Sequence, residues 1–274
     1  MDMKILKNLK KGSLVHCITN YVTVNDVANV ILASGGSPIM ADGIEEVSEI
    51  IEICNSLVIN IGTLNPRVIK SMLEAGKTAN KINKPVVLDP VAIGASNFRT
   101  ETCLNLLKEV RYSVIRGNAS EIKAILDGNK TSGGVDVSVE DIINESNLEE
   151  YIKVAKKVSE IYKSVVVITG PIDIVTDSKK TYIVRNGHEN MEKITGTGCM
   201  LAGLIGAFVG ANPTNILVST TMAVGMMGLS GELANKKMIK EDVGTSSLRM
   251  FLIDYISKLD EEGLKEGLKI ETYK

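Results

Sequence analysis

Ile194-Thr195-Gly196-Thr197-Gly198-Cys199-Met200 is the stretch around which this chain is organised, and the apolar run 201–208 follows it directly. Apolar residues at helical spacing begin immediately after the glycines, so we expect a helix whose first backbone N–H groups lack partners within the helix. Glycine at 196 and 198 removes the Cβ atoms that would keep an anion away from those N–H groups. The stretch therefore predicts an anion-binding helix start, although a glycine-rich loop before a buried helix explains these residues equally well when they are taken alone.

Cys199 is the most reactive side chain that this stretch offers. It is expected in the first turn of the helix, where the positive end of the helix dipole lowers the pKa of a thiol. A free thiol has a pKa of about 8.5, so such a shift would bring it into the range of a usable base. The alternative interpretation is a structural cysteine.

The composition is that of an ordinary globular protein. Of the 274 residues, 44% are hydrophobic and 23% are charged, and 31 basic and 33 acidic residues leave a formal net charge of −2. Acidic and basic residues are interspersed, so nothing favours a nucleic-acid-binding or membrane-binding surface, and we expect a small-molecule ligand. No apolar run reaches the ~18 residues that crossing a bilayer requires, so the late apolar helices are expected in the core.

Four cysteines, at positions 17, 54, 103 and 199, show neither a C-x-x-C motif nor the spacing of a Cys/His metal site. The N-terminus lacks the apolar segment of a signal peptide, so we expect a reducing, cytoplasmic location. His16 and His188 are isolated in the sequence and are expected to be structural.

Apolar runs of strand length alternate with helical patterns up to residue 170. The runs cover residues 56–62, 85–90, 112–117 and 164–170, and the helical patterns cover 24–34, 44–54, 66–81, 101–109, 118–126 and 147–163. Continuous apolar strands separated by helices predict an α/β fold with a mostly parallel sheet that is covered on both faces.

The rest of the chain predicts an antiparallel edge followed by helices. Short strands are expected at 173–176 and 181–185, and Asn186-Gly187 is a strong hairpin-turn signal. Helices are expected at 198–209, 215–236 and 246–259, followed by a short charged tail. The segment 128–134 is the most loop-like interior stretch. Because no Pro/Gly/Ser-rich linker or fixed-period repeat occurs, we predict a single domain over residues 1–274.

Polar residues close the four apolar runs. Asn60 and Gly62 close the first run, Asp89 the second, Arg116 with Asn118 and Glu121 the third, and Thr169 and Gly170 the fourth. Because the carboxyl ends of parallel strands meet at one edge of a sheet, we expect these groups to emerge together, with residues 195–199 lying across them. A carboxylate, an arginine, an Asn-x-x-Glu turn and a glycine-rich anion cradle are the parts of a phosphoryl-transfer site.

Several of these residues also have a structural explanation. Asp89 precedes a proline and can begin a turn. Asn118 can cap the helix that follows, with Glu121 completing a capping box, and Thr169-Gly170 is a common strand-to-turn pair. Arg116, by contrast, ends an apolar run and is more typical of a ligand clamp than of a surface charge.

Segments along nearly the whole chain, from about residue 10 to 260, closely resemble hydroxyethylthiazole kinases. The segments that carry this resemblance are Leu14-Val15-His16-Cys17-Ile18-Thr19-Asn20-Tyr21-Val22, Gly36-Ser37-Pro38-Ile39-Met40-Ala41, Leu88-Asp89-Pro90-Val91, Ile115-Arg116-Gly117-Asn118-Ala119-Ser120-Glu121-Ile122, Val167-Ile168-Thr169-Gly170 and Thr195-Gly196-Thr197-Gly198-Cys199-Met200. The resemblance implies a ribokinase-like, three-layer αβα fold. It also implies transfer of the ATP γ-phosphate to the hydroxyl of 4-methyl-5-(2-hydroxyethyl)thiazole, in thiamine biosynthesis or salvage, by a homotrimer with active sites at subunit interfaces.

The resemblance also implies roles for individual residues. It places Met40, Gly196 and Asn20 at the thiazole, and Arg116 and Thr169 at ATP. Asp89 and Asn118, at the ends of neighbouring strands, are expected at ATP as well. The backbone at Thr197 and Gly198 would form an anion hole, and Cys199 would be catalytic, at the position of the aspartate base of related sugar kinases. Glu121 would organise Mg²⁺ largely through water, because Mg²⁺ dehydrates reluctantly.

Three other functions share features with this sequence. A nicotinamide-dependent oxidoreductase is disfavoured because the glycine after Gly196-x-Gly198 is Gly203, so G-x-G-x-x-G fails, and because the motif comes late in the chain. The Ile-Thr-Asn and Ser-Pro-Ile-Met segments disfavour hydroxymethylpyrimidine kinases and ATP-dependent nicotinamide-nucleotide-hydrate dehydratases of the same superfamily. A non-catalytic nucleotide sensor remains an alternative, which the presence of Arg116, Glu121 and Cys199 disfavours.

Overall fold

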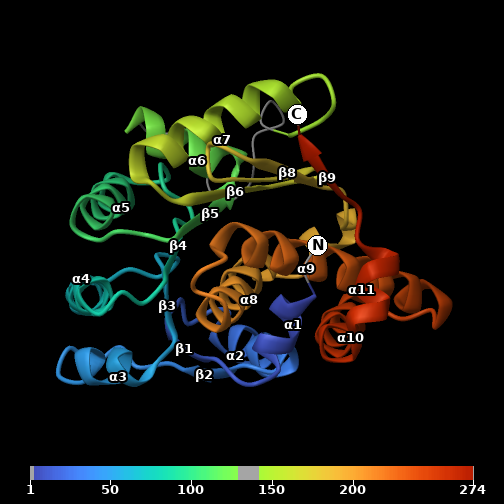
Figure 1. Cartoon of the computed structure of the whole chain (residues 1–274), viewed down its shortest axis with the longest axis horizontal. Helices are drawn as coiled ribbons and strands as arrows, with labels where there is room; N and C mark the ends of the chain where they lie inside the picture. Colours follow the sequence, from blue (N-terminus) through green and yellow to red (C-terminus); the bar gives the residue numbers. More distant parts are fainter. Residues whose placement is uncertain (1–2, 129–141, 274) are drawn as a thin grey trace.

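The computed structural model describes residues 3–128 and 142–273, and all nine strands in these ranges belong to one sheet (Figure 1). The strands are β1 (Leu14–Ile18), β2 (Ser37–Ile39), β3 (Ser56–Asn60), β4 (Val86–Asp89), β5 (Val114–Asn118), β6 (Val165–Thr169), β7 (Asp173–Thr176), β8 (Thr181–Val184) and β9 (Ile270–Tyr273). Their order is β2-β1-β3-β4-β5-β6-β7-β8-β9. The pairs from β2 to β6 are parallel, and β7, β8 and β9 add antiparallel pairs. The predicted mostly parallel sheet with an antiparallel edge is confirmed.

Helices cover both faces of this sheet (Figure 1). One face carries α3 (Val47–Ile53), α4 (Pro66–Lys81), α5 (Asn97–Glu109), α6 (Ala119–Asp127) and α7 (Leu148–Tyr162). The other carries α1 (Lys4–Leu9), α2 (Val24–Ser34), α8 (Thr197–Ala211), α9 (Ile216–Lys240), α10 (Thr245–Lys258) and α11 (Glu261–Gly267). A short 3₁₀ helix, η2 (Glu189–Lys193), precedes α8. The arrangement is the three-layer αβα fold that was predicted.

Alternation along the strands divides the core into two layers. Val58 and Val87 belong to the apolar cluster on the α8 side, whereas Leu57 and Leu88 belong to the cluster under α4 and α5. Successive side chains of a strand point to opposite faces, so a strand that is buried on both faces reads as a continuous apolar run. For this reason the central strands could be recognised in the sequence.

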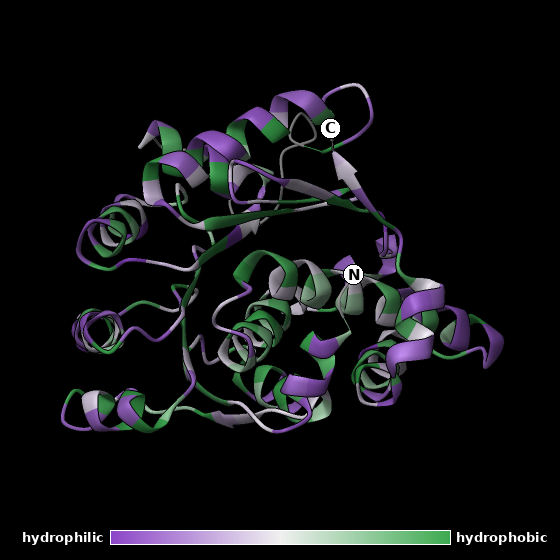
Figure 2. Ribbon diagram, viewed as in Figure 1, coloured by the Kyte–Doolittle hydropathy of each residue, from purple (hydrophilic) through white to green (hydrophobic). Residues whose placement is uncertain are grey.

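Helix α8 packs closely on the sheet because a glycine faces the strands. Residues 199–210 of this helix are all buried, and Figure 2 shows the helix as apolar on every side. A Cβ atom at Gly206 would lie 2.5 Å from Cγ2 of Val58 and 3.0 Å from Cγ1 of Val15. The helix backbone therefore approaches β1 and β3 more closely than a side chain would permit, and this position fixes the start of α8 relative to the strand ends.

Helix α9 has the length and composition of a membrane-spanning helix, the one such helix among residues 3–128 and 142–273. The sequence analysis found no uninterrupted apolar run of that length. The helix nevertheless has a high mean hydropathy, because the Ser, Thr and Gly residues that interrupt the run lower the mean only slightly. In the structure, 72% of the apolar 18-residue stretch of this helix is buried inside the protein. The helix is therefore a core helix, as expected for the late apolar segments.

Some predictions about the ends of elements were wrong. Asn186-Gly187 does not form a hairpin turn, because the 3₁₀ helix η2 follows it rather than a strand. The turn that joins β7 and β8 is formed by residues 177–180, where the Asp177 carboxylate accepts the N–H groups of Lys179 and Lys180. Asn186 instead donates to the Gly267 carbonyl and to Glu232, and accepts from the Lys269 N–H.

The sequence also missed or misplaced several elements. The charged tail contains α11 and β9, and β9 pairs with β8 at the edge of the sheet. Strands β1 and β2 were not predicted, and α5 begins at Asn97, where the Ser96 side chain caps it. Of the predicted loop at 128–134, Gly128 ends α6 with a φ of 60°, and residues 129–134 lie outside the described residues.

The close approach of α8 to β1 and β3 leads to a prediction about stability. Gly206→Ala is expected to lower the free energy of unfolding by about 1–3 kcal/mol, because the added methyl group must displace a stiff, buried valine. Gly263→Ala is the matched control, since its Cβ would come no closer than 3.2 Å to the end of the Leu259 side chain and 3.5 Å to Oδ1 of Asp260. Chemical denaturation of both variants measures the difference. Equal stabilities would contradict the account of α8 packing.

Candidate active site

Polar side chains from four adjacent strands converge at the start of α8. Asn60, Asp89, Arg116 and Thr169 each follow, by two residues, a valine that packs on the α8 side, at positions 58, 87, 114 and 167. Two-residue periodicity therefore turns all four toward α8. Asn60 lies opposite Asp89 in the strand register. The structure thus brings together the strand-end residues predicted from the sequence.

Arg116 and Asp89 form a buried ion pair. Nη1 of Arg116 lies 3.1 Å from Oδ1 of Asp89, and the two side chains are 10% and 0% exposed. Nη2 donates to the Thr169 hydroxyl at 2.8 Å. Burial alone would lower the pKa of Arg116, but Asp89 and then Glu121 raise it, so the guanidinium remains charged. Burial raises the pKa of Asp89, and Arg116 opposes that shift.

The start of α8 presents free backbone N–H groups beside this pair. Gly196 is the N-cap with a φ of 85°, and no side chain of the described residues caps the helix. The Met200 N–H bonds to the Gly196 carbonyl, so the N–H groups of residues 197–199 precede the first intrahelical bond. A Cβ at Gly198 would lie 2.5 Å from Nη1 of Arg116. A guanidinium and a bare helix start therefore share one small volume, which is suited to an anion.

Cys199 lies at the same point but is not an acidified thiol. Asn20 and Asn60 donate to its Sγ at 3.2 and 3.3 Å. Burial and then the charge of Asp89 raise the pKa of Cys199, and the neighbouring polar groups of Thr23, Arg116 and Asn60 only oppose the rise. The expectation that the helix start would lower this pKa was wrong, because Cys199 is buried, with 8% of the residue exposed, and its thiol faces a carboxylate.

Asn118 and Glu121 form the capping box of α6. The Glu121 N–H donates to Oδ1 of Asn118 at 2.8 Å, and Oε2 of Glu121 accepts the Asn118 N–H at 2.8 Å. Oε1 of Glu121 accepts the Ala92 N–H at 2.9 Å. Burial raises the pKa of Glu121, Arg116 opposes that rise and Asp89 adds to it. Asn118 and Glu121 therefore do cap α6, as their structural explanation predicts. This capping is compatible with a further role toward a ligand.

The Glu121 carboxylate fits a magnesium ion that is held mainly by water and phosphate. Each oxygen of Glu121 accepts one N–H and retains a free lone pair. Within the described ranges, no group of three His, Cys, Asp or Glu side chains forms a direct metal site. Mg²⁺ usually keeps several waters and takes one or two carboxylates with substrate phosphates, so the donor set is compatible with it.

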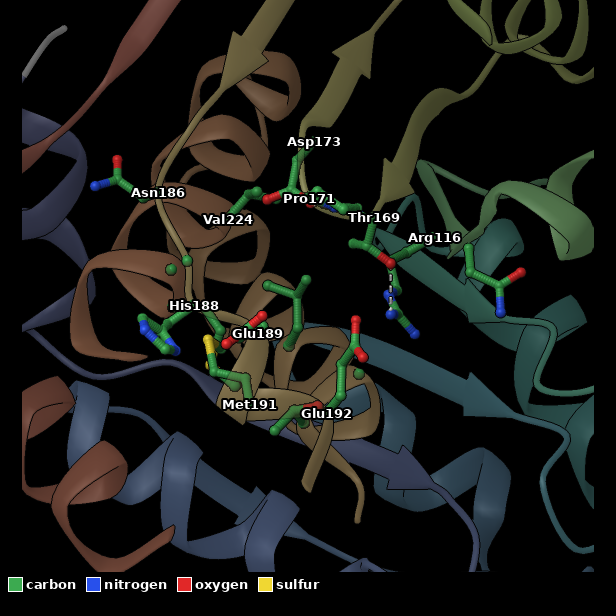
Figure 3. A pocket seen from close by; sticks show the side chains of 18 residues that line it. Arg116, Thr169, Pro171, Asp173, Asn186, His188, Glu189, Met191, Glu192 and Val224 are labelled. Carbon is green, nitrogen blue, oxygen red and sulfur yellow. Dashed lines mark hydrogen bonds between the residues drawn. The ribbon is translucent and has the colours of Figure 1, made fainter. Parts of the chain in front are cut away.

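A cavity of about 540 Å³ opens on one side of this cluster (Figure 3). Arg116 and Thr169, joined by their hydrogen bond in Figure 3, form one part of its wall, with Asn118 and the first turn of α8 beside them. The rest is formed by residues 170, 171 and 173, by residues 186–189, 191 and 192, by Leu201 of α8, and by α9. The residues predicted to bind ATP thus line one cavity, except Asp89, which lies behind Arg116.

The residues predicted to bind the acceptor lie elsewhere. Asn20 and Cys199 touch each other outside the lining of this cavity. A Cβ at Gly196 would clash with the Thr23 methyl group, so only glycine fits there. Met40 follows β2 and is partly buried against the α8-side core. Its contact with a ligand stays a prediction.

The two histidines make backbone contacts. Nε2 of His16 lies 2.7 Å from the Ala41 carbonyl, and Nδ1 of His188 accepts the Asn190 N–H as the cap of η2. Burial lowers the pKa of His16. These are structural contacts, and His188 in addition lines the cavity.

Three side chains at the site carried no predicted role. Asn60 contacts both Asp89 and Cys199, Thr23 donates to Oδ1 of Asn20, and Asp173 lines the cavity and accepts the Gly170 N–H. The sequence placed Asn60 at the site edge as a strand-end residue, but no local signal gave it a role. No local signal marks Thr23 or Asp173, because their contacts depend on how separate loops meet.

Comparison with known proteins identifies relatives of this chain. A family model described as the hydroxyethylthiazole kinase family matches residues 6–262. A hydroxyethylthiazole kinase from Clostridium acetobutylicum is 51% identical over 269 residues, which cover 98% of each chain.

Solved structures agree with this match. The structure of a hydroxyethylthiazole kinase protein from Pyrococcus horikoshii aligns with 99% of this chain and 98% of its own, with a TM-score of 0.88 and 36% identity. A ribokinase-like superfamily protein from Enterococcus faecalis aligns over 94% of this chain and 95% of its own, with a TM-score of 0.60 and 15% identity. The second similarity shows the shared fold alone.

The buried carboxyl group of Asp173, in the cavity wall, leads to a prediction of how the stability of the protein changes with pH. Burial raises the pKa of Asp173 to about 7, although the Gly170 N–H and Arg116 oppose the shift. A carboxyl group whose pKa is raised on folding stabilises the protein most at low pH, and this stabilisation is lost as the pH rises through 7. At about 1.4 kcal/mol for each pKa unit, the loss amounts to about 4 kcal/mol.

Asp173→Asn is therefore expected to remove this fall in stability between acidic and alkaline pH. Denaturation curves of the unmodified chain and the variant across the pH range measure it, with Glu160→Gln, on the exposed surface of α7, as the control. A constant stability difference between variant and unmodified chain at all pH values would contradict the prediction.

Proposed function

The chain belongs to the hydroxyethylthiazole kinase family, and we propose that it transfers the γ-phosphate of ATP to the hydroxyl of 4-methyl-5-(2-hydroxyethyl)thiazole, in thiamine biosynthesis or salvage. The observation that carries this proposal is the meeting of a buried guanidinium, a bare helix start and a thiol at one point. The first two neutralise a transferring phosphoryl group, and the third faces the acceptor.

ATP is assigned to the cavity beside Arg116. A volume of about 540 Å³ lies within the range of small-molecule sites. Arg116 and Thr169 would hold the phosphates, with Asn118 beside them, and Asp89 would orient the guanidinium through its ion pair. The N–H groups at Thr197 and Gly198 would receive the γ-phosphate, because they carry the positive end of the helix dipole.

The acceptor is assigned to the opposite side of Cys199, with Met40, Asn20 and Gly196 around the thiazole. A polarizable methionine suits contact with a thiazole ring. The raised pKa of Cys199 keeps the thiol neutral, so its first role is to orient the alcohol by a hydrogen bond. Early proton removal is not required, because the transition state of phosphoryl transfer is loose.

Magnesium is the divalent ion assigned to the site. When bound, Mg²⁺ neutralises charge on the phosphates. Glu121 would hold it largely through water, since both of its carboxylate oxygens already accept backbone N–H groups.

A homotrimer with sites at subunit interfaces is also proposed. Tyr21 and Val22, next to Asn20, are 78% and 62% exposed. Exposed apolar side chains beside the acceptor end are consistent with a covering subunit.

A cytoplasmic location is also proposed. All four cysteines are free, as in a reducing cytoplasm.

The proposed function is tested by an ATP- and Mg²⁺-dependent phosphorylation assay with the thiazole alcohol, run beside hydroxymethylpyrimidine and a panel of sugars. Phosphorylation of the thiazole alcohol alone is expected. A preference for another acceptor would overturn the acceptor assignment, and thermal stabilisation by ATP without turnover would favour a nucleotide sensor.

Cys199→Ala tests the division of roles within the site. We expect kcat to fall by about 10²-fold, because the acceptor alcohol loses the hydrogen bond that orients it, while turnover remains measurable. The dissociation constant of ATP, measured by calorimetry, is expected to stay near that of the unmodified chain. Cys54→Ala, a buried thiol outside the site, is the control. Loss of both turnover and ATP affinity in Cys199→Ala would contradict this division.

A further inference from the structure

Asn60 occupies the centre of the polar cluster, although neither motif nor comparison gives it a role. It is buried at the carboxyl end of β3, between β1 and β4. Its Nδ2 donates to Oδ2 of Asp89 at 2.7 Å and to Sγ of Cys199 at 3.3 Å. Its Oδ1 accepts the Gly62 N–H at 2.8 Å and Nδ2 of Asn20 at 3.1 Å. Both ends of the carboxamide are therefore in use.

The orientation of this carboxamide follows from its partners. The Gly62 N–H can only donate, so the oxygen of Asn60 must face it. Both amide hydrogens are then directed at the Asp89 carboxylate and the Cys199 sulfur, which is the arrangement that an ionised carboxylate requires. The same reasoning fixes Asn20, whose Oδ1 accepts the Thr23 N–H at 3.1 Å.

Two amide donors consequently meet on one sulfur atom. Asn20 donates from the chain beyond β1 and Asn60 from the end of β3, so the sulfur is held between two strands. Through its other hydrogen, Asn60 also holds Asp89, which pairs with Arg116. One carboxamide thus joins the thiol to the guanidinium across three adjacent strands.

We propose that Asn60 is a positioning residue for phosphoryl transfer, which fixes the Cys199 sulfur relative to the Asp89–Arg116 pair. This inference rests on the proposed function, because it assigns the sulfur to the acceptor alcohol and the guanidinium to the phosphates. A displacement of about 1 Å between reacting groups can cost a factor of 10² in rate. Asn60 acts through the sulfur, so its contribution depends on the presence of Cys199.

A double-mutant cycle tests this dependence. Asn60→Ala is expected to lower kcat by about 10- to 100-fold and to leave the KM for ATP within about threefold. In the Cys199→Ala background, the same substitution is expected to cost about threefold or less, because no sulfur remains to be positioned. An equal fold-loss in both backgrounds would overturn the proposal.

Asn60→Asp is the second variant. A carboxylate of the same shape still accepts from Gly62 and Asn20 but donates to neither Asp89 nor Cys199. We expect its kcat at alkaline pH to be no higher than that of Asn60→Ala, and a kcat near that of the unmodified chain would overturn the proposal. Asn80→Asp is the matched control, since Asn80 also bridges two polar groups, the N–H and carbonyl of Arg111, away from the site.

A measurement that needs no turnover separates this inference from the proposed function. The rate at which iodoacetamide labels Cys199, identified by mass spectrometry of the labelled peptide, is measured against pH. Removal of the Asn60 donor is expected to move the midpoint of this profile to higher pH, whereas Asn80→Asp leaves it unchanged. An unchanged midpoint in Asn60→Ala would overturn the inference, even in a chain that phosphorylated another acceptor.

Discussion

The buried ion pair between Arg116 and Asp89 is the interaction on which the site depends. A buried charge is tolerated only when it is paired and hydrogen-bonded, and removal of one partner of a buried pair costs about 3–5 kcal/mol. Adjacent parallel strands supply the pairing, because Asp89 ends β4 and Arg116 lies near the end of β5. Thr169 on β6 satisfies a second guanidinium nitrogen. The strand order therefore determines both the stability and the charge of the site.

Helix α8 completes this arrangement because small residues let it approach the sheet. Gly206 admits the valines of β1 and β3, and Gly198 admits the Arg116 guanidinium at the helix start. The same close contact that buries the core therefore places unpaired N–H groups beside a fixed cation. Fold and function share one requirement here, so a substitution that lifts α8 from the sheet would also separate the anion-binding groups.

The sequence predicted the features that depend on local pattern. The central strands are buried on both faces and read as apolar runs, and their last residues point to the site. Strand β1 was missed because His16 interrupts its apolar pattern, and β2 because it has only three residues, one of them Pro38. Strand β9 was missed because it forms only against β8. The acidity of Cys199 and the contacts of Asn60 depend on neighbours from other strands, which no local motif reveals.

The most direct measurement is a crystal structure of the protein with a non-hydrolysable ATP analogue, Mg²⁺ and the thiazole alcohol. The account predicts that the terminal phosphate contacts Arg116 and the N–H groups of residues 197–199. It also predicts that the hydroxyl of the acceptor lies within hydrogen-bond distance of the Cys199 sulfur. A terminal phosphate bound away from the start of α8, or an acceptor hydroxyl remote from Cys199, would contradict it.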